Sequence, residues 1–410
     1  MAQSASQVVV NSFYSDVLGV PKQYAIYLPQ GYDEGSALYP VVYFLRLHER
    51  EWFDTGIPER NGIGLKEVAD ALIAQGLIGE MILVGPSTGS DDGSVAGMVN
   101  MLQPDLTKAT GIGSGRFEDY FVEDLVPEIE NQYRTLTSSA FRGVDGFSFG
   151  GYTALVLTFR NPGLFSSVGS YDGTHMWYNL EDPAVAEVGP NDPFWLNNTY
   201  DELVGPLFGV PRDVGYMLKH NAINLLLAAD AAKLDSLRAI RFHIHTGDDD
   251  GLTNMRRTNQ LVDSMAVRGI VNSFPSTVLF PGARHDYSFA NFHATRSLVA
   301  HWETFQLNQP VAATRDPIPN EDQLYTAPNP FVEETTIHYA IQQPTQAELE
   351  IYDMAGRKVR RLVSRFHAAG MHEVVWDAND AAGTRVAAGV YWGALRTDTS
   401  VQVLSLMVAR

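Results

Sequence analysis

The sequence contains no cysteine, few basic residues and no long apolar run, and each absence excludes a class of function. Without cysteine, the 410-residue chain forms no disulfide, uses no thiolate nucleophile and offers no thiolate to a metal. Lysine and arginine number 29 against 48 aspartates and glutamates, and the net charge of -19 argues against binding to nucleic acid or an anionic membrane through a basic surface. No run of about 18 apolar residues occurs, so no transmembrane segment is predicted.

What is present is a two-part chain whose residue pattern changes near residue 310. Apolar, β-branched segments alternate with helical patterns over residues 1–309, which predicts an α/β domain with a mostly parallel sheet. Residues 310–325 are rich in proline and polar residues and are interpreted as a linker. Short segments of alternating polarity over residues 326–410 predict a small all-β sandwich.

The expected elements follow from these periodicities. In the first domain, strands are expected over residues 23–29, 39–45, 80–86, 142–147, 166–173, 240–248 and 276–282, and helices over residues 64–76, 117–134, 152–161, 253–269 and 289–305. In the second domain, strands are expected within residues 335–341, 347–363, 372–380, 389–398 and 401–410.

The stretch GVDGFSFGGYTAL contains a serine between glycines, with a strand pattern before it and a helix pattern after it. Gly146, Ser148 and Gly150 form the G-x-S-x-G pattern of a nucleophile elbow in the strand–turn–helix context that the motif requires. A serine held in a strained turn needs neighbours that lack a Cβ. The pattern therefore predicts that Ser148 is a nucleophile.

A serine nucleophile needs a histidine base and an acid that orients the base. In a doubly wound hydrolase the chain order is serine, acid, histidine, each in a loop after a strand. His285, in the loop FPGARHDYSF, fits the base. Asp172, in SYDG, and the run Asp248–Asp250, in HTGDDDGL, both fit the acid, and the residue pattern does not decide between them.

His243 and His245 form an H-x-H pair on an expected strand, a spacing that can bind zinc. No third ligand stands near them in the sequence, so structural roles are favoured over a metal site. No cofactor and no metal is expected for the chain.

The segments QYAIYLPQGYDEGSALYPVVYFL, FEDYFVEDLVPEIENQYRT, GFSFGGYTAL, HTGDDDGL and FPGARHDYSF together resemble the putative-esterase family of α/β-hydrolases. That family includes S-formylglutathione hydrolases and bacterial feruloyl and acetylxylan esterases. The resemblance covers about residues 8–306 and implies a catalytic triad of Ser148, Asp250 and His285. It selects Asp250 because the family's acid follows a G-x-x-D turn, here beginning at Gly247.

The chain departs from the family after the expected strand 39–45, where the family usually has His-Gly and a glycine-containing loop. The sequence here is RLHEREWFDTG. The resemblance implies that the amide of Phe149 is one oxyanion donor and that the second comes from this loop, with Leu47 or His48 as the candidates. The charged side chains of the loop are interpreted as a surface feature, with substrate binding as the alternative.

Residues 175–227 are aromatic and proline-rich and fit no simple strand–helix unit, so they are expected to form a cap over the active site. Trp177, Tyr178 and Trp195 would either stack on an aromatic or sugar substrate or anchor the cap to the body of the domain.

The segments APNPF, TTIHYAI, AELEIYDMAGRKVRRL and GMHEVVWDANDAAGTRVAAGVYWGAL resemble the type IX secretion sorting domain, which has an Ig-like fold. The resemblance implies export by the bacterial secretion machinery, with a binding or spacer domain as the alternative. The opening MAQSASQ is similar to what remains after removal of a signal peptide.

These observations predict a secreted, extracellular or cell-surface serine carboxylesterase that acts through an acyl-enzyme. Feruloyl or acetyl esters of plant polysaccharide are the expected substrates, followed by other aromatic esters, including synthetic polyesters. Two alternatives stay open: a non-catalytic carbohydrate- or surface-binding protein on a degenerate hydrolase scaffold, and an acyltransferase that uses the same triad.

Overall fold

The computed structural model describes residues 4–95, 97, 99–173, 201–248, 254–279, 282–308, 324–327, 329, 331–341, 345–353, 357–368, 370–397 and 401–408. The chain divides into two compact units, Met1–Gln309 and Pro310–Arg410. No helix in the described ranges has the length and hydropathy needed to cross a membrane.

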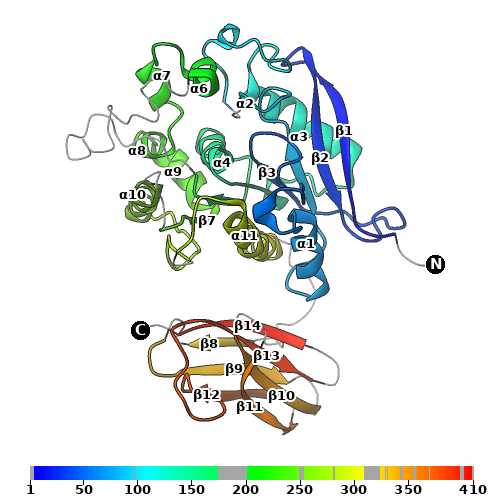
Figure 1. Ribbon diagram of the computed structural model, residues 1–410, viewed down its shortest axis with the longest axis vertical. Coiled ribbons are helices and arrows are strands. Elements are labelled where there is room, and N and C mark those ends of the chain that lie inside the picture. Colours follow the sequence, from blue (N-terminus) through cyan, green and yellow to red (C-terminus); the bar gives the residue numbers. More distant parts are fainter. Residues whose placement is uncertain are drawn as a thin grey trace. The chain divides into compact units, whose positions relative to one another are not determined.

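A seven-stranded sheet in the order β1-β2-β4-β3-β5-β6-β7 forms the centre of the first unit (Figure 1). Its strands are β1 (Gln7–Ser15), β2 (Val20–Leu28), β3 (Val41–Leu45), β4 (Ile82–Pro86), β5 (Arg142–Gly146), β6 (Ser167–Tyr171) and β7 (Arg241–His245). The edge pair β1–β2 is antiparallel, β2 is antiparallel to β4, and the other five strands are parallel. Every residue of β3, β4, β5 and β6 is buried, as expected for parallel strands covered on both faces.

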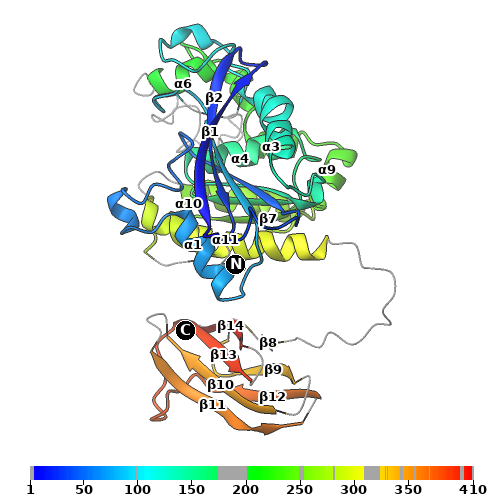
Figure 2. The same cartoon turned by 90° about the vertical axis from the view of Figure 1, so that its right-hand side faces the viewer.

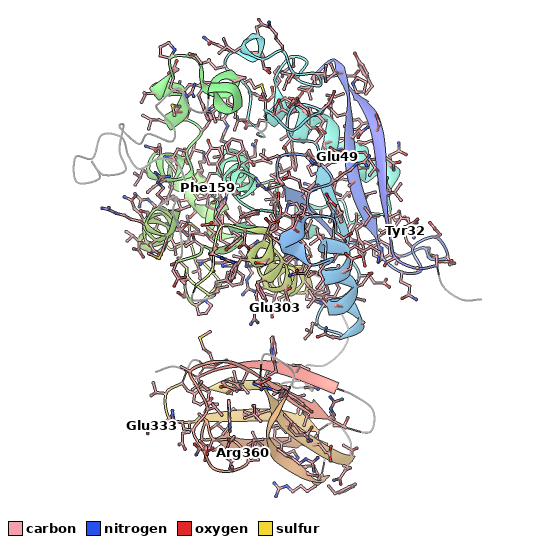
Figure 3. All side chains as sticks on the ribbon, viewed as in Figure 1. Tyr32, Glu49, Phe159, Glu303, Glu333 and Arg360 are labelled. Carbon is pink, nitrogen blue, oxygen red and sulfur yellow. The ribbon has the colours of Figure 1, made fainter. Side chains whose placement is uncertain are left out.

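Helices cover both faces of this sheet (Figure 2). Helices α1 and α11 contribute to one apolar core, and α3, α4, α8 and α10 contribute to the core on the other face. Figure 3 labels Phe159 on the buried helix α4 and Glu303 on α11. The helices are α1 (Leu65–Ala74), α2 (Phe117–Asp119), α3 (Val126–Gln132), α4 (Phe149–Arg160), α6 (Asp201–Phe208), α7 (Val214–Leu218), α8 (Ala222–Leu227), α9 (Ala231–Arg238), α10 (Asn254–Val267) and α11 (Tyr287–Leu307).

The architecture confirms the predicted α/β-hydrolase sheet, and several elements differ locally from the expected ones, among them helix α9, which was not expected. The edge strand β1 was not expected. The expected helix over residues 117–134 is divided by a π-helical segment, Tyr120–Leu125, that ends before Pro127 near the start of α3. The prediction of a strand over residues 276–282 is wrong for residues 276–279, the part that the structure describes, because these residues form no strand. There the amide of Val278 bonds to the hydroxyl of Ser276, and among the described residues the carbonyl of Thr277 makes a single backbone bond, with the amide of Thr246 after β7.

The second unit consists of two antiparallel sheets, which confirms the predicted Ig-like class. One sheet has the order β11-β10-β13-β14 and the other the order β12-β9-β8. Their apolar faces enclose Trp376, whose ring makes edge contacts with Phe331 and Tyr391. The strands are β8 (Leu324–Ala327), β9 (Thr335–Ile341), β10 (Thr345–Tyr352), β11 (Lys358–His367), β12 (Gly370–Trp376), β13 (Gly389–Arg396) and β14 (Val401–Val408).

Candidate active site

Ser148 lies in the turn between β5 and α4, with φ of 58° and ψ of -125°. A positive φ is rare for a residue with a side chain and is maintained only where surrounding contacts enforce it. Here the Ser148 amide donates to the carbonyl of Tyr171 (3.0 Å), and the Ser148 carbonyl accepts from the amide of Tyr152 (3.1 Å). The strained turn places the serine side chain at the carboxyl end of β5, as the elbow motif predicts.

The glycines around Ser148 are required by close backbone contacts. A Cβ on Gly146 would lie 2.3 Å from the carbonyl carbon of Gly150, and a Cβ on Gly150 would lie 1.9 Å from the carbonyl oxygen of Leu45. Neither distance is compatible with a side chain, so the turn and the end of β3 approach each other only because both positions are glycine.

Ser148, His285 and Asp172 form a hydrogen-bonded set. The Nε2 atom of His285 lies 2.8 Å from Ser148 Oγ, and the Nδ1 atom contacts the carboxylate of Asp172. Asp172 is fully buried, and its other carboxylate oxygen accepts a hydrogen bond from Thr246 Oγ1 (2.6 Å). The Asp172 amide also donates to the carbonyl of His245 (3.0 Å), which fixes the carboxylate at the end of β6. This arrangement can orient an imidazole that removes the proton of a serine hydroxyl.

The acid that contacts His285 among the described residues is Asp172, whereas the family resemblance selects Asp250. Asp249 and Asp250 lie outside the described residues. Asp248 has a different partner, because its carboxylate accepts a hydrogen bond from the amide of Gly282 (2.6 Å) and thereby holds the loop that precedes His285. Asp172 reaches His285 because β6 is the neighbour of β5, so its carboxyl end lies beside the elbow. The residue pattern fits Asp172 as the acid equally well, whereas the family's motif spacing selects Asp250.

The imidazole of His285 is supported but not enclosed. The ring of Phe147 lies 4.8 Å from it, and the hydroxyl of Tyr171 donates to the carbonyl of Arg284 (2.6 Å). The side chain of His285 is 24% exposed, whereas the side chain of Asp172 is fully buried. Ser148 is 9% exposed. The base therefore keeps part of its surface exposed and the nucleophile only a small part, while the acid is shielded.

In the loop after β3, the two amides that the resemblance implies as oxyanion donors already have an acceptor. The amides of Leu47 and His48 both donate to one carboxylate oxygen of Glu51, at 2.7 and 3.0 Å. Neither amide is available to a substrate in this conformation. The amide of Phe149 is the first of α4, directly after Ser148. Glu49, labelled in Figure 3, marks the position of this loop.

Several contacts hold the loop in place. The second carboxylate oxygen of Glu51 accepts a hydrogen bond from the hydroxyl of Tyr287 and lies 3.7 Å from Arg46 Nε. Thr88 Oγ1 bonds to the carbonyl of Arg46 (2.6 Å), and Trp52 Nε1 donates to the carbonyl of Leu45 (3.0 Å). Burial, reinforced by the charge of Glu51, raises the pKa of Tyr287 to about 12, so its hydroxyl stays a donor at neutral pH.

A second group of serine, histidine and aspartate side chains lies inside the domain. Ser167 Oγ lies 2.8 Å from His243 Nε2 and 2.6 Å from His301 Nδ1. His301 Nε2 lies 3.1 Å from a carboxylate oxygen of Asp145. All of these side chains are at most 1% exposed. They have the donors and acceptors of a triad, but no substrate can reach the serine.

Asp145 connects this buried group to the elbow. Its carboxylate contacts His293 and His301 and accepts the amide of Gly146 (2.6 Å). Burial alone would raise the pKa of Asp145, but the two imidazoles outweigh burial and hold the pKa well below its usual range. His293 Nδ1 in turn lies 2.8 Å from His245 Nε2.

His243 and His245, the pair considered as metal ligands, thus belong to a hydrogen-bonded interior. Burial, together with a neighbouring imidazole, lowers the pKa of each histidine well below its usual value. Across the described ranges, no group of three or more histidine, aspartate or glutamate side chains is arranged to hold a metal ion.

The aromatic residues predicted to bind substrate, Trp177, Tyr178 and Trp195, lie outside the described residues. The later part of segment 175–227 contains α6, α7 and α8, and α8 packs on the core that also contains α4. The hydroxyl of Tyr152, on α4, donates to the carbonyl of His220 in this part of the segment.

Comparisons with known proteins agree with this architecture. Residues 15–203 match the family described as Putative esterase, and residues 332–399 match the family described as FlgD Ig-like domain. A solved ferulic acid esterase is 21% identical, with a TM-score of 0.56 over 73% of this chain and 99% of that one. A fluorophosphonate-binding serine hydrolase from Staphylococcus aureus is 14% identical, with a TM-score of 0.51 over 73% of this chain and 99% of that one. At these identities the two structures show the fold.

One curated relative is named Endo-1,4-beta-xylanase/feruloyl esterase, from Xylanibacter ruminicola. It is 27% identical over an alignment of 206 residues, and the alignment covers 47% of this chain and 26% of the relative. The chain therefore spans about a quarter of the length of that relative.

Proposed function

We propose that the first unit, of which residues 15–203 match the putative esterase family, is a serine carboxylesterase. The observation that carries this proposal is the contact of His285 with Ser148 on one side of its ring and with Asp172 on the other. In the proposed reaction an ester is cleaved by water to a carboxylic acid and an alcohol, without a cofactor.

In the first half-reaction Ser148 Oγ attacks the ester carbonyl carbon while His285 Nε2 takes the hydroxyl proton. The carbonyl π electrons move to oxygen, which becomes the oxyanion of a tetrahedral intermediate. When the intermediate collapses, the carbon–oxygen bond to the alcohol breaks and His285 returns the proton to the leaving oxygen. Asp172 keeps Nδ1 protonated and stabilises the imidazolium that forms in between.

In the second half-reaction water repeats these steps on the acyl-enzyme. His285 takes a proton from the attacking water, a second tetrahedral intermediate forms, and Ser148 Oγ leaves as the bond to the acyl carbon breaks. The proton held by His285 then restores the serine hydroxyl. The amide of Phe149 is assigned as one donor to the oxyanion in both intermediates.

Esters of plant polysaccharide, with feruloyl or acetyl groups, are the proposed substrates, and other aromatic esters, including synthetic polyesters, follow. The xylanase/feruloyl esterase name of the curated relative supports this order. The second unit is proposed to direct export through a type IX secretion system, since residues 326–410 resemble its sorting domain. Secretion of the full chain, and retention of a chain that lacks residues 326–410, in a bacterium with that system would support this role.

The first test is hydrolysis of p-nitrophenyl acetate and methyl ferulate by the wild type and by Ser148→Ala. The variant is expected to lose at least about 10⁴-fold in kcat/KM, because the nucleophile acts as a unit with its base. Ser167→Ala is the matched control, since it removes another serine hydroxyl that contacts histidine. Equal rates in wild type and Ser148→Ala would reject the esterase and favour a binding protein on the same scaffold.

A further inference from the structure

The Glu51 carboxylate accepts hydrogen bonds from the backbone amides that are expected to supply the second contact to the oxyanion. One carboxylate oxygen accepts hydrogen bonds from the consecutive amides of Leu47 and His48, at 2.7 and 3.0 Å. Two adjacent amides that point at one oxygen form an anion-binding arrangement. A carboxylate oxygen in this arrangement has the charge and the hydrogen-bond needs of the oxyanion of a tetrahedral intermediate.

The sheet register places this arrangement beside the nucleophile. Strands β3 and β5 are parallel, with Leu45 opposite Gly146, and Leu47 and Ser148 each follow two residues after this pair. The backbone confirms the closeness, because a Cβ on Gly150 would lie 2.9 Å from the amide nitrogen of Arg46. The loop and the elbow are therefore neighbours and not separate surface features.

Glu51 is also joined to the histidine loop. The hydroxyl of Tyr287, two residues after His285, donates to Glu51 and accepts a hydrogen bond from Arg46 Nε (3.0 Å). The guanidinium of Arg46 lies 4.9 Å from the ring centre of Phe147, within the elbow. One carboxylate thus bridges the loop after β3 and the start of α11.

We propose that the Glu51 carboxylate occupies the second oxyanion position of the esterase, so that acyl transfer requires Glu51 to leave the amides of Leu47 and His48. This proposal rests on the proposed function of Ser148. Arg46 offers the displaced carboxylate a partner, because its Nε already lies 3.7 Å from the second Glu51 oxygen. Glu51 is in this sense a gating residue, and the structure is the closed form.

The test compares the wild type with Glu51→Ala and Glu51→Gln on p-nitrophenyl acetate. Glu51→Ala frees both amides, and kcat is expected to rise at least about tenfold, since one oxyanion donor typically contributes about 10²–10³ in rate. KM is expected to stay within about threefold, because the new contact forms only in the transition state. Glu51→Gln keeps an acceptor but removes the charge that strengthens the two hydrogen bonds, so a smaller rise is expected.

Glu49→Gln is the matched control, because Glu49 is a buried carboxylate in the same loop that pairs with Arg50 (3.5 Å) and makes no contact with these amides. Its kcat is expected to stay at the wild-type value. Thermal unfolding of all three variants separates a change at the site from loss of the fold.

A second readout uses an added anion. Formate is expected to refill the vacated amides of Glu51→Ala and to return its rate toward that of the wild type, while the wild type stays insensitive at the same concentration. Sodium chloride at equal ionic strength serves as the control for screening.

The outcomes distinguish the two proposals. If wild-type hydrolysis depends on Ser148 but neither folded Glu51 variant gains in kcat, or if formate acts equally on wild type and variant, the gating proposal is wrong and the esterase stands. If hydrolysis in the wild type and in both Glu51 variants is independent of Ser148, the proposed function itself fails.

Discussion

Ser148 with its partners can be compared with Ser167 and its partners, because both serines donate to or accept from histidine in the same domain. His285 contacts Ser148 at 2.8 Å, and His301 contacts Ser167 at 2.6 Å. The difference is position: Ser148 stands in a strained turn beyond the end of β5, and Ser167 lies within β6. Similar hydrogen bonds therefore occur at the edge of the sheet, where Ser148 keeps 9% of its surface exposed, and within the sheet, where Ser167 is fully buried.

The two acids differ in the same way. Asp172 orients one histidine whose side chain remains partly exposed, whereas Asp145 stands between two histidines that are fully buried. A carboxylate held by two imidazoles has no free face toward a substrate, and its removal should affect stability more than catalysis. Four measurements test this division, in order of decreasing expected effect.

Asp172→Asn is expected to lower kcat by about 10³–10⁴-fold with little change in thermal stability, because the imidazole loses the acceptor that fixes its tautomer. Asp250→Asn is the matched variant and is expected to stay within about threefold of the wild type. Ester hydrolysis at pH 8 measures both. The reverse pattern would assign the orienting role to Asp250, as the family spacing implies.

Asp145→Asn is expected to lower the free energy of unfolding by about 3–5 kcal/mol, since it leaves two buried histidines without their charged partner. Urea unfolding followed by fluorescence measures this loss. Asp235→Asn is the control, because Asp235 is exposed and paired only on the surface with Arg238, and its change should be near zero. A stable Asp145→Asn protein with lost activity would instead place Asp145 in the reaction.

The free energy of unfolding is expected to fall by about 2–4 kcal/mol when the pH is lowered from 7 to 5. His243 and His245 have pKa values lowered by burial below the unfolded value of about 6.5, so protons bind the unfolded chain more tightly. Their contribution is complete above about pH 6.5 and is lost as the pH falls below it. Asp145, whose pKa is also lowered, adds a loss only below about pH 4.

Urea midpoints at intervals across this range measure the slope, and His243→Asn should flatten it. A midpoint that does not change from pH 7 to pH 5 would contradict the buried, neutral state of these histidines.

Ser167→Ala is expected to cost about 1–3 kcal/mol of unfolding free energy, because His243 and His301 each lose a buried partner. Its kcat should stay within about twofold of the wild type, in contrast to Ser148→Ala. A large loss of kcat in a folded Ser167→Ala protein would break the distinction between the two serines.

Much of the fold was predictable because the period and the length of the apolar segments distinguish buried parallel strands from helices. The strands around the elbow, helices α1 and α11 and the sandwich strand β9 fall where the residue pattern placed them. The elements that were predicted wrongly have local causes. The hydroxyl of Ser276 accepts a hydrogen bond from a nearby amide, and residues 120–125 form a π-helical segment. Neither feature changes the spacing of apolar residues along the sequence.

The sequence by itself determined the elbow, since the contacts that require Gly146, Gly150 and a strained Ser148 arise within a few residues of chain and the strand beside them. It also identified His285 by loop context and chain order. The contact of Asp172 with His285 and that of Glu51 with the loop amides depend on tertiary structure. Asp172 reaches His285 because two strands are neighbours in the sheet, and Glu51 reaches the amides of Leu47 and His48 because its loop folds back on itself. Such contacts depend on distances in space, which spacing along the chain does not encode.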